Sequence, residues 1–456
     1  MSVTTATKQQ WQEMDRAHHL HPFTDFKELN ERGTRVITRA AHINIYDADG
    51  REYLDGMSGL WCCNLGYSRT EIVDAVTRQL KELPFYNNFF QCAHPPSIEL
   101  AKVLADITPS HMNHVFFTNS GSEGNDTVLR MVRRYWDLEN QPKKRMIISR
   151  INGYHGSTIA GASLGGMAFM HKQFEPLPYV THVQQPYWYG DDGAHSREEF
   201  GVLAARALEQ KIEELGPDNV AAFIAEPVQG AGGVIIPPET YWPEIRRILA
   251  RYDILFISDE VICGFGRTGK WFGHEYYGME PDLMTFAKAV TNGYQALGGV
   301  MVGERVVNVL NSGGGEFGHG FTYSGHPAAC AAGLATLRIL REENILGHVA
   351  TTTGPHLARR WAELADHPLV GEARTLGLFG ALELVRNKKT RERFTPAGRA
   401  GMLCRQASLD NGLVMRATGD TMIIAPPLIC SVAEIDTLVE RSRAALDQAA
   451  RELGVA

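Results

Sequence analysis

The chain has 456 residues, of which 44% are hydrophobic and 21% are charged, and its formal net charge is −7. A chain of this length is too long for one compact core, and its composition is that of an ordinary globular protein with about two domains. The acidic balance, without any lysine- or arginine-rich block, excludes a typical nucleic-acid-binding protein.

No membrane span or secretory signal is predicted. Every apolar run is shorter than the roughly 18 residues that a membrane span needs. Residues 1–19 lack the apolar core of a secretory signal. The seven cysteines are scattered without CxxC spacing, which is typical of reduced thiols rather than of disulfides or zinc ligands. The sequence therefore predicts a cytoplasmic protein with neither a nucleic-acid nor a membrane partner.

The first predicted elements are an N-terminal arm and a hairpin. Residues 18–26, HHLHPFTDF, bring three histidines close together, but no carboxylate or cysteine frame accompanies them. A structural arm is therefore favoured over a metal site, and no metal is predicted. Residues 41–56 predict two short strands around the turn that begins at Asp47, and residues 70–83 predict a helix.

The central part of the chain alternates between strands and helices. Short apolar runs predict strands at residues 115–118, 146–149, 221–225, 254–260 and 283–288. The helix after the first strand carries apolar side chains at helical spacing, namely Val128, Met131, Val132 and Tyr135. This alternation predicts an α/β fold with a mostly parallel sheet that is covered by helices on both faces.

The C-terminal part has a different pattern. After a long helix at about residues 328–343, residues 374–385 predict antiparallel strands, residues 414–428 predict a second hairpin, and residues 432–454 predict a terminal helix. This pattern is typical of a smaller α+β domain, which the N-terminal hairpin is expected to join. The predicted division is an N-terminal arm with part of the small domain (1–58), a large domain (59–334) and the C-terminal small domain (335–456).

Reactive or small polar side chains follow the predicted strands. The clusters are NSGS, NGYHGST, EPVQG and SDE, and Lys288 ends the last strand. Because the carboxyl ends of parallel strands lie along one crevice, we expect these clusters to converge. A lysine and a carboxylate that meet there predict a pyridoxal 5'-phosphate site. Lys288 is then the amine that bonds to the cofactor, and Asp259 is the partner of the ring nitrogen.

A glycine-rich loop mimics a nucleotide-binding motif. GFGRTGK at residues 264–270 matches the pattern G-x-x-x-x-G-K, so a phosphate-loop nucleotide hydrolase is the alternative from another class of enzyme. That motif requires a serine or threonine next, for magnesium, and a helix that begins at the loop. Trp271 follows instead, and glycine and proline break the segment beyond it, so the alternative is disfavoured.

Ser120-Gly121-Ser122 is the better phosphate candidate. It lies between a predicted strand and a predicted helix, and the backbone amides at a helix N-terminus bind anions. A serine at this position could instead cap the helix by accepting hydrogen bonds from its first amides. The residues alone leave these two interpretations balanced.

The motifs also resemble a known family. HHLHPFTD, GLWCCNLGY, NSGSEGND, NGYHGST, EPVQGAGG, DEVICGFGRTGKWFG, FAKAVTNGY and HGFTYSGHP follow one another over residues 18–327, and MRATGDTMIIAPPL continues the match. In this order they resemble the class III pyridoxal-phosphate aminotransferases of fold-type I. The match is closest to the omega-transaminases that transfer an amine, such as putrescine or another diamine, to pyruvate. The resemblance implies a large cofactor-binding domain and a small domain built from both termini.

The resemblance implies roles for residues around the cofactor ring. Lys288 is expected to bond to the cofactor and later to move a proton, and Asp259 is expected to keep the ring nitrogen protonated. Tyr154 is expected to stack on one face of the ring and Val261 to pack on the other. Ile262 stands where many members of the family have a glutamine that serves the ring hydroxyl, as it does in the omega-transaminase subgroup.

A shared active site is also implied. Gly121 and Ser122 are expected to bind the phosphate, together with Thr322 from a neighbouring subunit. The expected assembly is therefore either a homodimer with shared active sites or a homotetramer.

The expected substrates are a small-molecule amine donor and pyruvate. The substrate pocket is expected to be lined by Trp61, Phe23 and Phe89, and Arg416 is expected to bind the carboxylate of the acceptor. The resemblance implies a ping-pong reaction in which a terminal amine leaves as an aldehyde and pyruvate leaves as L-alanine. A β-alanine or other ω-amino acid:pyruvate transaminase is the alternative within the family.

Overall fold

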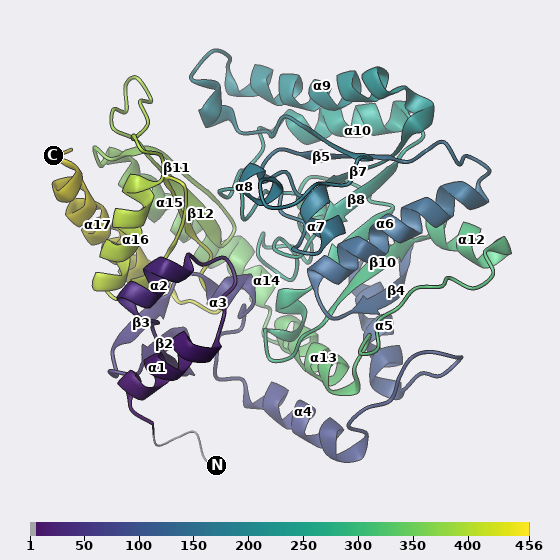
Figure 1. Ribbon diagram of the computed structural model, residues 1–456, viewed down its shortest axis with the longest axis horizontal. Coiled ribbons are helices and arrows are strands. Elements are labelled where there is room, and N and C mark those ends of the chain that lie inside the picture. Colours follow the sequence, from purple (N-terminus) through teal and green to yellow (C-terminus); the bar gives the residue numbers. More distant parts are fainter. Residues whose placement is uncertain (1–5, 456) are drawn as a thin grey trace.

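The computed structural model describes residues 6–455, which fold into a large sheet covered by helices and two smaller sheets beside it (Figure 1). The large sheet has seven strands in the order β4-β10-β9-β8-β7-β5-β6. Its strands are β4 (Met112–Thr118), β5 (Met146–Arg150), β6 (Val180–Val183), β7 (Val220–Ala225), β8 (Leu255–Asp259), β9 (Leu283–Phe286) and β10 (Gly298–Gly303).

One strand of this sheet runs against the other six. Strands β5 to β9 pair in parallel, whereas β10 pairs antiparallel with both β9 and β4. Strand β4 therefore has the same direction as β9, and its carboxyl end lies at the same edge of the sheet. The predicted mostly parallel sheet is confirmed, and this direction of β4 is what allows its NSGS cluster to join the others.

Helices cover both faces of the large sheet, so its strands β7, β8 and β10 are buried on both sides. α6 (Gly121–Leu138) and α12 (Glu304–Gly313) pack on one face, where the four predicted apolar side chains of α6 are all buried. α9 (Arg197–Leu215) and α10 (Tyr241–Arg251) pack on the other face against Phe223 and Phe256. Towards β4 and β10, the sheet is covered by α5 (Pro95–Ile107) and α13 (Pro327–Glu342).

The two smaller sheets combine both ends of the chain. One has the order β1-β2-β3-β13, from β1 (Ile37–Ala41), β2 (Asn44–Asp47), β3 (Glu52–Asp55) and β13 (Leu413–Val414). The other has the order β11-β12-β15-β14, from β11 (Val370–Leu376), β12 (Phe379–Leu384), β14 (Arg416–Thr418) and β15 (Thr421–Ile424). Both predicted hairpins are confirmed, since β2 pairs antiparallel with β3 and β14 with β15.

The remaining helices surround the small sheets or connect the layers. Near the small sheets lie α14 (Ile345–His348), α15 (Gly354–Ala362), α16 (Arg399–Asp410) and α17 (Val432–Leu453). The others are α3 (Ser58–Trp61), α4 (Thr70–Glu82), α7 (Ile159–Leu164), α8 (Ala168–His171) and α11 (Gly273–Tyr276). The predicted boundary between residues 334 and 335 falls inside α13, which packs on α4 and α5. Among the described residues, no helix is both long enough and apolar enough to cross a membrane.

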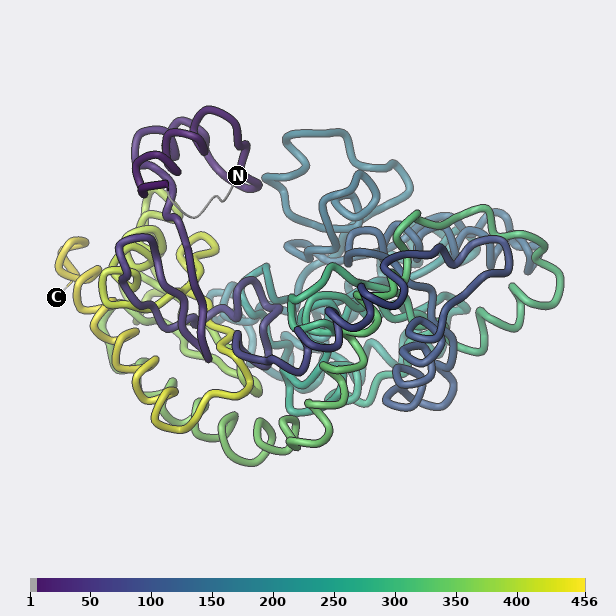
Figure 2. Tube along the Cα trace, turned by 90° about the horizontal axis from the view of Figure 1, so that it is seen from below, coloured from purple at the N-terminus to yellow at the C-terminus, as the bar shows by residue number. Residues whose placement is uncertain are grey.

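An N-terminal arm extends from this body. It consists of α1 (Lys8–His18) and α2 (Phe26–Arg32), and Figure 2 shows it standing out above the C-terminal part of the chain. No residue of either helix is buried, so the arm is held by a few contacts rather than by a core of its own. One of these contacts is made by Phe23, whose ring centroid lies 6.3 Å from that of Tyr154 and 6.4 Å from that of Phe169.

Candidate active site

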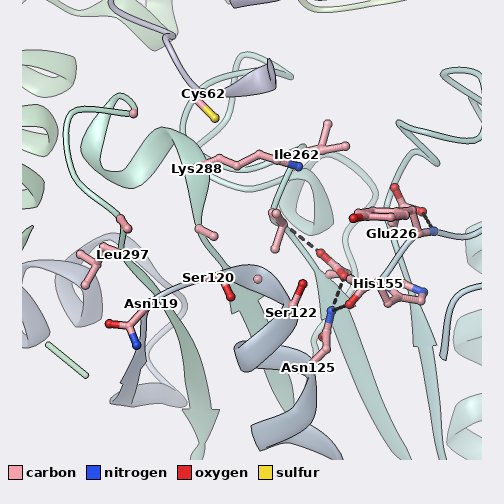
Figure 3. A pocket seen from close by; sticks show the side chains of 18 of the residues that line it. Cys62, Asn119, Ser120, Ser122, Asn125, His155, Glu226, Ile262, Lys288 and Leu297 are labelled. Carbon is pink, nitrogen blue, oxygen red and sulfur yellow. Dashed lines mark hydrogen bonds and ion pairs between the residues drawn. The ribbon is translucent and has the colours of Figure 1, made fainter. Parts of the chain in front are cut away.

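The predicted strand-end clusters converge on one pocket of about 400 Å³ (Figure 3). It lies at the carboxyl ends of the parallel strands, where the segments that follow β4, β5, β7, β8 and β9 meet the segment that precedes β10. Of the predicted site residues, six line it: Gly121, Ser122, Tyr154, Asp259, Val261 and Lys288.

Asp259, the last residue of β8, is a buried and well-bonded carboxylate. Its Oδ2 accepts a hydrogen bond from Asn125 Nδ2 at 2.9 Å and lies 2.7 Å from His155 Nδ1, and its Oδ1 accepts one from the Val261 amide at 3.1 Å. Burial alone would raise the pKa of this carboxyl, but the hydrogen bonds and the His155 charge outweigh it and hold the pKa below its usual value. Asp259 is therefore negatively charged and can hold a cationic ring nitrogen.

Lys288 enters the same pocket from the turn after β9. Its φ of +51° is in the left-handed region, a conformation that non-glycine residues adopt rarely and mainly at functional sites. Burial lowers the pKa of the amine, although the nearby Cys62, Asp259 and Glu226 act in the opposite direction. The amine forms no hydrogen bond or ion pair with the described residues, so it is free to react as a nucleophile or as a base.

The helix that follows β4 offers an anion site. Ser120 is the N-cap of α6 and accepts a hydrogen bond from the Glu123 amide at 3.2 Å, and the Ser120 carbonyl accepts one from the Gly124 amide. The amides of Gly121 and Ser122 are the first two of the helix and have no acceptor within it. The capping interpretation is confirmed for Ser120, and the phosphate interpretation stays a prediction that is compatible with it, because the next two residues face the pocket.

The walls of the pocket are close to each other near Gly121. A Cβ atom at this position would lie 2.8 Å from Val261 Cγ2, so only glycine leaves the backbone that close to the Val261 side chain. Tyr154, also in the lining, has its hydroxyl 3.0 Å from Ser157 Oγ, and the Ser157 amide donates to Ser122 Oγ at 3.1 Å. These contacts tie the segment after β5 to the start of α6.

Three pocket residues were missed as site residues by sequence reasoning. His155 and Asn125 bond to Asp259, and Glu226 accepts hydrogen bonds from the amides of Tyr154 (3.1 Å) and Gly230 (2.9 Å). Burial raises the pKa of the Glu226 carboxyl. His155 and Glu226 stand in the polar clusters that follow β5 and β7, and Asn125 lies three residues after NSGS in α6, but nothing in the sequence separated these positions from their neighbours.

The remaining predicted site residues do not line this pocket within one chain. Trp61 is buried in a cluster with Ile262, which does line the pocket, and Phe23 is exposed beside Tyr154. Arg416, in β14, makes no ion pair with the described residues, and burial lowers the pKa of its guanidinium. Their assigned roles therefore stay predictions.

Phe89 and Thr322 also lie outside the pocket. Phe89 and Gly320 line a separate groove. Thr322 follows Gly320 by two residues, and its side chain is exposed. Nothing within a single chain brings either residue to Lys288, so their assigned roles also stay predictions.

Glu260, the second carboxylate of the SDE cluster, has a structural role instead. Glu260 is fully buried and accepts hydrogen bonds from the amides of Gly273 and His274, both at 2.7 Å, and from Ser258 Oγ at 3.0 Å. Burial raises the pKa of this carboxyl to about 7. Gly273 and His274 begin the four-residue helix α11, so the anion-binding amides after the glycine-rich loop already hold a protein carboxylate. The phosphate-loop alternative is therefore not supported.

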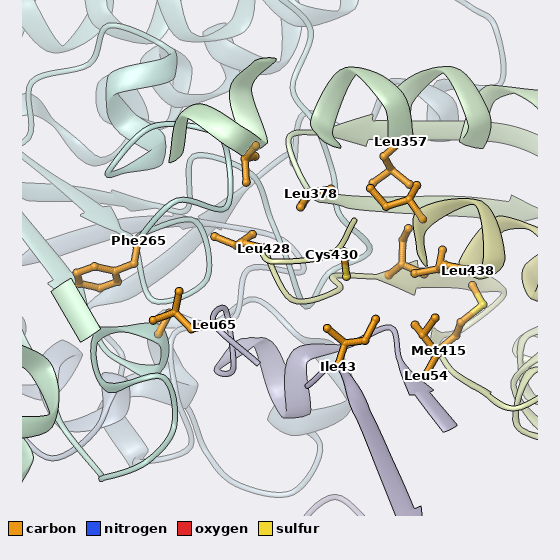
Figure 4. Packing of buried hydrophobic residues seen from close by; sticks show 14 of the residues in the cluster. Ile43, Leu54, Leu65, Phe265, Leu357, Leu378, Met415, Leu428, Cys430 and Leu438 are labelled. Atoms are coloured by element: carbon orange, nitrogen blue, oxygen red, sulfur yellow. The ribbon is translucent and has the colours of Figure 1, made fainter. Parts of the chain in front are cut away.

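The glycine-rich loop joins the two parts of the molecule instead. Arg267 is fully buried and donates to the carbonyls of Leu378 (2.8 Å) and Pro426 and to the side chains of Ser58 (3.2 Å) and Asn64. Figure 4 shows Phe265, from the same loop, in one apolar cluster with side chains from both ends of the chain, among them Leu65 and Leu428. The loop thus fixes the small sheets to the segment that carries Asp259.

The pocket fits pyridoxal phosphate. Asp259 Oδ1 accepts only the Val261 amide, so a lone pair remains for a protonated ring nitrogen. Gly121 and Ser122 present free amides for a phosphate, and Tyr154 and Val261 present flat and apolar groups for a ring. The Asn125 Oδ1 atom is buried without a hydrogen-bond partner, which marks this as a site prepared for a polar ligand.

Comparisons with known proteins agree with this geometry. The family model of the class III aminotransferases matches residues 28–446. A putrescine–pyruvate aminotransferase from Pseudomonas aeruginosa is 62% identical over 98% of both chains. A mitochondrial gamma aminobutyrate transaminase from Solanum lycopersicum is 42% identical over 92% of this chain and 82% of its own.

A solved structure is similar over nearly the whole chain. The omega-transaminase from Pseudomonas jessenii, in complex with PMP, has a TM-score of 0.94 and 42% identity, and the match covers 97% of this chain and 99% of that one. The agreement extends to both small sheets and not only to the pocket-bearing sheet.

Proposed function

Because the chain belongs to the class III aminotransferases, which use pyridoxal phosphate, we infer that it transfers an amino group from a terminal amine to pyruvate. The donor is putrescine or another diamine, or a similar ω-amine, and the products are an aldehyde and L-alanine. The reaction follows a ping-pong course, since one pocket serves both substrates in turn.

One observation carries the proposal. Lys288 and Asp259 share a pocket in which the amine has no partner and a lowered pKa while the carboxylate is held ionised. This pairing is the one that a pyridine-ring cofactor with an aldehyde requires. The choice of a diamine and pyruvate rests in addition on the 62% identity to a putrescine–pyruvate aminotransferase.

Eight of the residues that line the pocket have a proposed part in this reaction. Bound pyridoxal phosphate supplies a protonated ring that withdraws electrons from the carbon that loses its proton. Asp259 holds the proton on the ring nitrogen, and His155 and Asn125 hold Asp259 in place. The Lys288 amine would hold the cofactor covalently at rest and would act as the base that takes and returns the substrate proton. The amides of Gly121 and Ser122 would hold the phosphate, while Tyr154 and Val261 would confine the ring.

Arg416 is the residue proposed to bind the carboxylate of the acceptor. Its guanidinium is partly buried, has no anionic partner among the described residues, and is near enough to Lys288 to contribute to the lowered pKa of that amine, which is due mainly to burial. A carboxylate such as that of pyruvate would supply the missing partner. Trp61, Phe23 and Phe89 are proposed to line the space for the carbon chain of the donor. An ω-amino acid is the alternative donor, since relatives that act on gamma aminobutyrate are 42% identical.

The active enzyme is proposed to be a homodimer with shared active sites, or a homotetramer built from such dimers. Thr322 is exposed on a segment that contacts Phe89 through Gly320, so these residues would reach a pocket together. We assign them to the pocket of the partner, where Thr322 would add a hydroxyl to the phosphate site.

A cytoplasmic location and the predicted division into domains are also proposed. All seven cysteines are free, five of them buried, which agrees with a reducing compartment. The pairing of β3 with β13 agrees with a small domain built from residues 1–58 and 335–456, around a large domain of residues 59–334.

Half-reactions test this function. The purified holoenzyme is mixed with putrescine alone, and the visible absorption of the cofactor is followed; pyruvate is then added. We expect putrescine to remove the yellow absorption and pyruvate to restore it with one L-alanine per site. A gamma-aminobutyrate sample that bleaches the enzyme faster than putrescine would favour the ω-amino acid alternative. A protein that neither bleaches with any of these amines nor recovers with pyruvate would contradict the proposal.

A further inference from the structure

The N-terminal arm brings two histidines and a carboxylate to one point. Asp15 lies in α1, and His19 follows the helix directly, with its backbone amide bonded to the Asp15 carbonyl at 2.9 Å. The chain then turns back, so that the His21 ring lies beside the His19 ring with centroids 4.3 Å apart. The sequence-based expectation that no carboxylate accompanies these histidines is wrong, because Asp15 is one helical turn before His19.

All three side chains point their ligand atoms at each other. His19 Nδ1 lies 3.1 Å from Asp15 Oδ1, and His21 Nε2 lies 2.9 Å from Asp15 Oδ1 and 3.0 Å from Oδ2. One ligand atom from each residue can be chosen so that all three lie within 4.8 Å of one another. In a tetrahedral site with metal–nitrogen bonds of about 2.0 Å, neighbouring ligand atoms are about 3.3 Å apart. The nitrogen–oxygen distances are a few tenths of an ångström shorter than this, and the two imidazole nitrogens lie within 4.8 Å of each other.

We propose that Asp15, His19 and His21 form a binding site for a divalent transition-metal ion, with water in the remaining coordination positions. Two imidazole nitrogens and one carboxylate oxygen are ligands that suit Zn²⁺ and its neighbours in the first transition series, and not Mg²⁺ or Ca²⁺, which prefer oxygen. A structural arm, the interpretation favoured on sequence grounds, is compatible with this site, since the ion would fix the arm.

The site is open enough for an ion to enter. The cluster lies on the wall of a groove of about 760 Å³, and the side chains of Asp15, His19 and His21 are 16%, 62% and 23% exposed.

The ion would connect the arm to the pocket. His21 precedes Phe23 by two residues, and Phe23 contacts Tyr154, which lines the pocket. Because no residue of α1 or α2 is buried, a metal that ties α1 to residues 19–21 would reduce the mobility of this segment. The site itself does not depend on which amine the enzyme uses.

Zn²⁺ binding to the holoenzyme tests the site. The metal is titrated against a chromophoric chelator with wild-type protein and with His19→Ala, His21→Ala and Asp15→Asn. The matched control is His18→Ala, which removes a histidine in the same groove but outside the cluster. We expect one Zn²⁺ per chain in the wild type and the control, and affinity at least about tenfold weaker in each of the three variants.

Two further readouts make the result decisive. Co²⁺ should give the visible absorption of a nitrogen–oxygen site, and the His21→Ala variant should lack it. Zn²⁺ should also protect the arm from limited proteolysis in the wild type and the control alone. Equal Zn²⁺ affinity in the wild type and the His19→Ala and His21→Ala variants would overturn the proposal, and so would a wild-type protein that binds no Zn²⁺. Neither result depends on transaminase activity.

Discussion

Asp259 Oδ2 lies 2.7 Å from His155 Nδ1, and both side chains are almost fully buried at the base of the pocket. The histidine comes from the segment after β5 and the aspartate from the end of β8, so the contact joins two strand ends across β7. It keeps the carboxylate ionised in a place where burial would otherwise protonate it. The first prediction concerns this pair.

Replacing His155 by Phe should raise the pKa of Asp259. The wild-type pKa lies below its usual value, and without the histidine protonation of Asp259 begins at higher pH. Loss of a hydrogen bond to a charged group costs about 1.5 to 3 kcal/mol, and this loss falls on the ionised form of Asp259. The acid side of the pH profile of the amine half-reaction should move up accordingly. His155→Gln, which keeps a donor, should show a smaller shift; identical profiles in all three proteins would contradict this role.

Lys288→Ala should abolish turnover while the protein still binds the cofactor. The phosphate amides and Asp259 remain, so binding persists without the covalent bond, and the absorption of the cofactor should change to that of the free aldehyde. Lys270→Ala removes an exposed lysine from the glycine-rich loop and is the matched control, which should keep full activity. A Lys288→Ala enzyme with more than a few per cent of wild-type turnover would exclude the assigned role.

Gly121→Ala should weaken cofactor binding, because the new Cβ would lie 2.8 Å from Val261 Cγ2 and crowd the pocket. Overpacking costs about 1 to 3 kcal/mol, which corresponds to roughly a tenfold to hundredfold loss of affinity. Gly124→Ala on the same helix is the control, since its Cβ would meet no atom closer than 3.5 Å. Equilibrium titration of each apoenzyme with pyridoxal phosphate measures the cofactor affinity of both variants. Equal affinities in the two variants would show that the short distance between residue 121 and Val261 does not limit cofactor binding.

Arg416→Ala should impair the pyruvate half-reaction far more than the putrescine half-reaction. A charge-assisted hydrogen bond to a carboxylate is worth about 1.5 to 3 kcal/mol, so we expect kcat/KM for pyruvate to fall roughly 10- to 100-fold. The donor has no carboxylate and should lose little. Arg405→Ala, an exposed arginine nearby, serves as the control. Stopped-flow rates for each half-reaction decide the matter, and equal losses in both would argue against a carboxylate-binding arginine.

Glu260 should make the enzyme less stable as the pH rises. Its folded-state pKa of about 7 lies above the usual 4.5, so the folded protein binds the proton more tightly than the unfolded chain between these values. Stability from this group is therefore present at low pH and is lost as the pH rises through about 7, by about 2 kcal/mol between pH 5 and 8.

Glu260→Gln removes the titrating group and serves as the comparison. The variant is expected to be less stable than the wild type because its amide nitrogen would face a backbone amide donor, either that of Gly273 or that of His274. In urea unfolding, however, this difference should be smaller at pH 8 than at pH 5. A difference that is independent of pH would show that Glu260 keeps an ordinary pKa.

Much of the site was accessible from the sequence because parallel strands impose a simple rule. Polar clusters after apolar runs mark carboxyl ends, and carboxyl ends of parallel strands share one edge. Gly121, Ser122, Tyr154, Asp259, Val261 and Lys288 were placed together on that basis and from the family resemblance, and they do line one pocket. The hairpins, the amphipathic helices and the mostly parallel sheet also followed from local periodicity and turn residues.

The tertiary structure decided what local patterns leave open. The apolar residues of β10 would suit a parallel or an antiparallel strand equally well. The sequence therefore does not reveal that β10 runs antiparallel to its neighbours, or that the carboxyl end of β4 lies at the edge of the pocket. Asp259 and Glu260 are adjacent carboxylates, and only the tertiary structure shows that Asp259 lines the pocket while Glu260 accepts hydrogen bonds from the start of α11. Arg267 looked like part of a phosphate loop, yet its guanidinium is fully buried among carbonyls from the small sheets. Sequence determines where polar groups stand along each element, whereas their partners come from distant segments that meet only when the sheets pack.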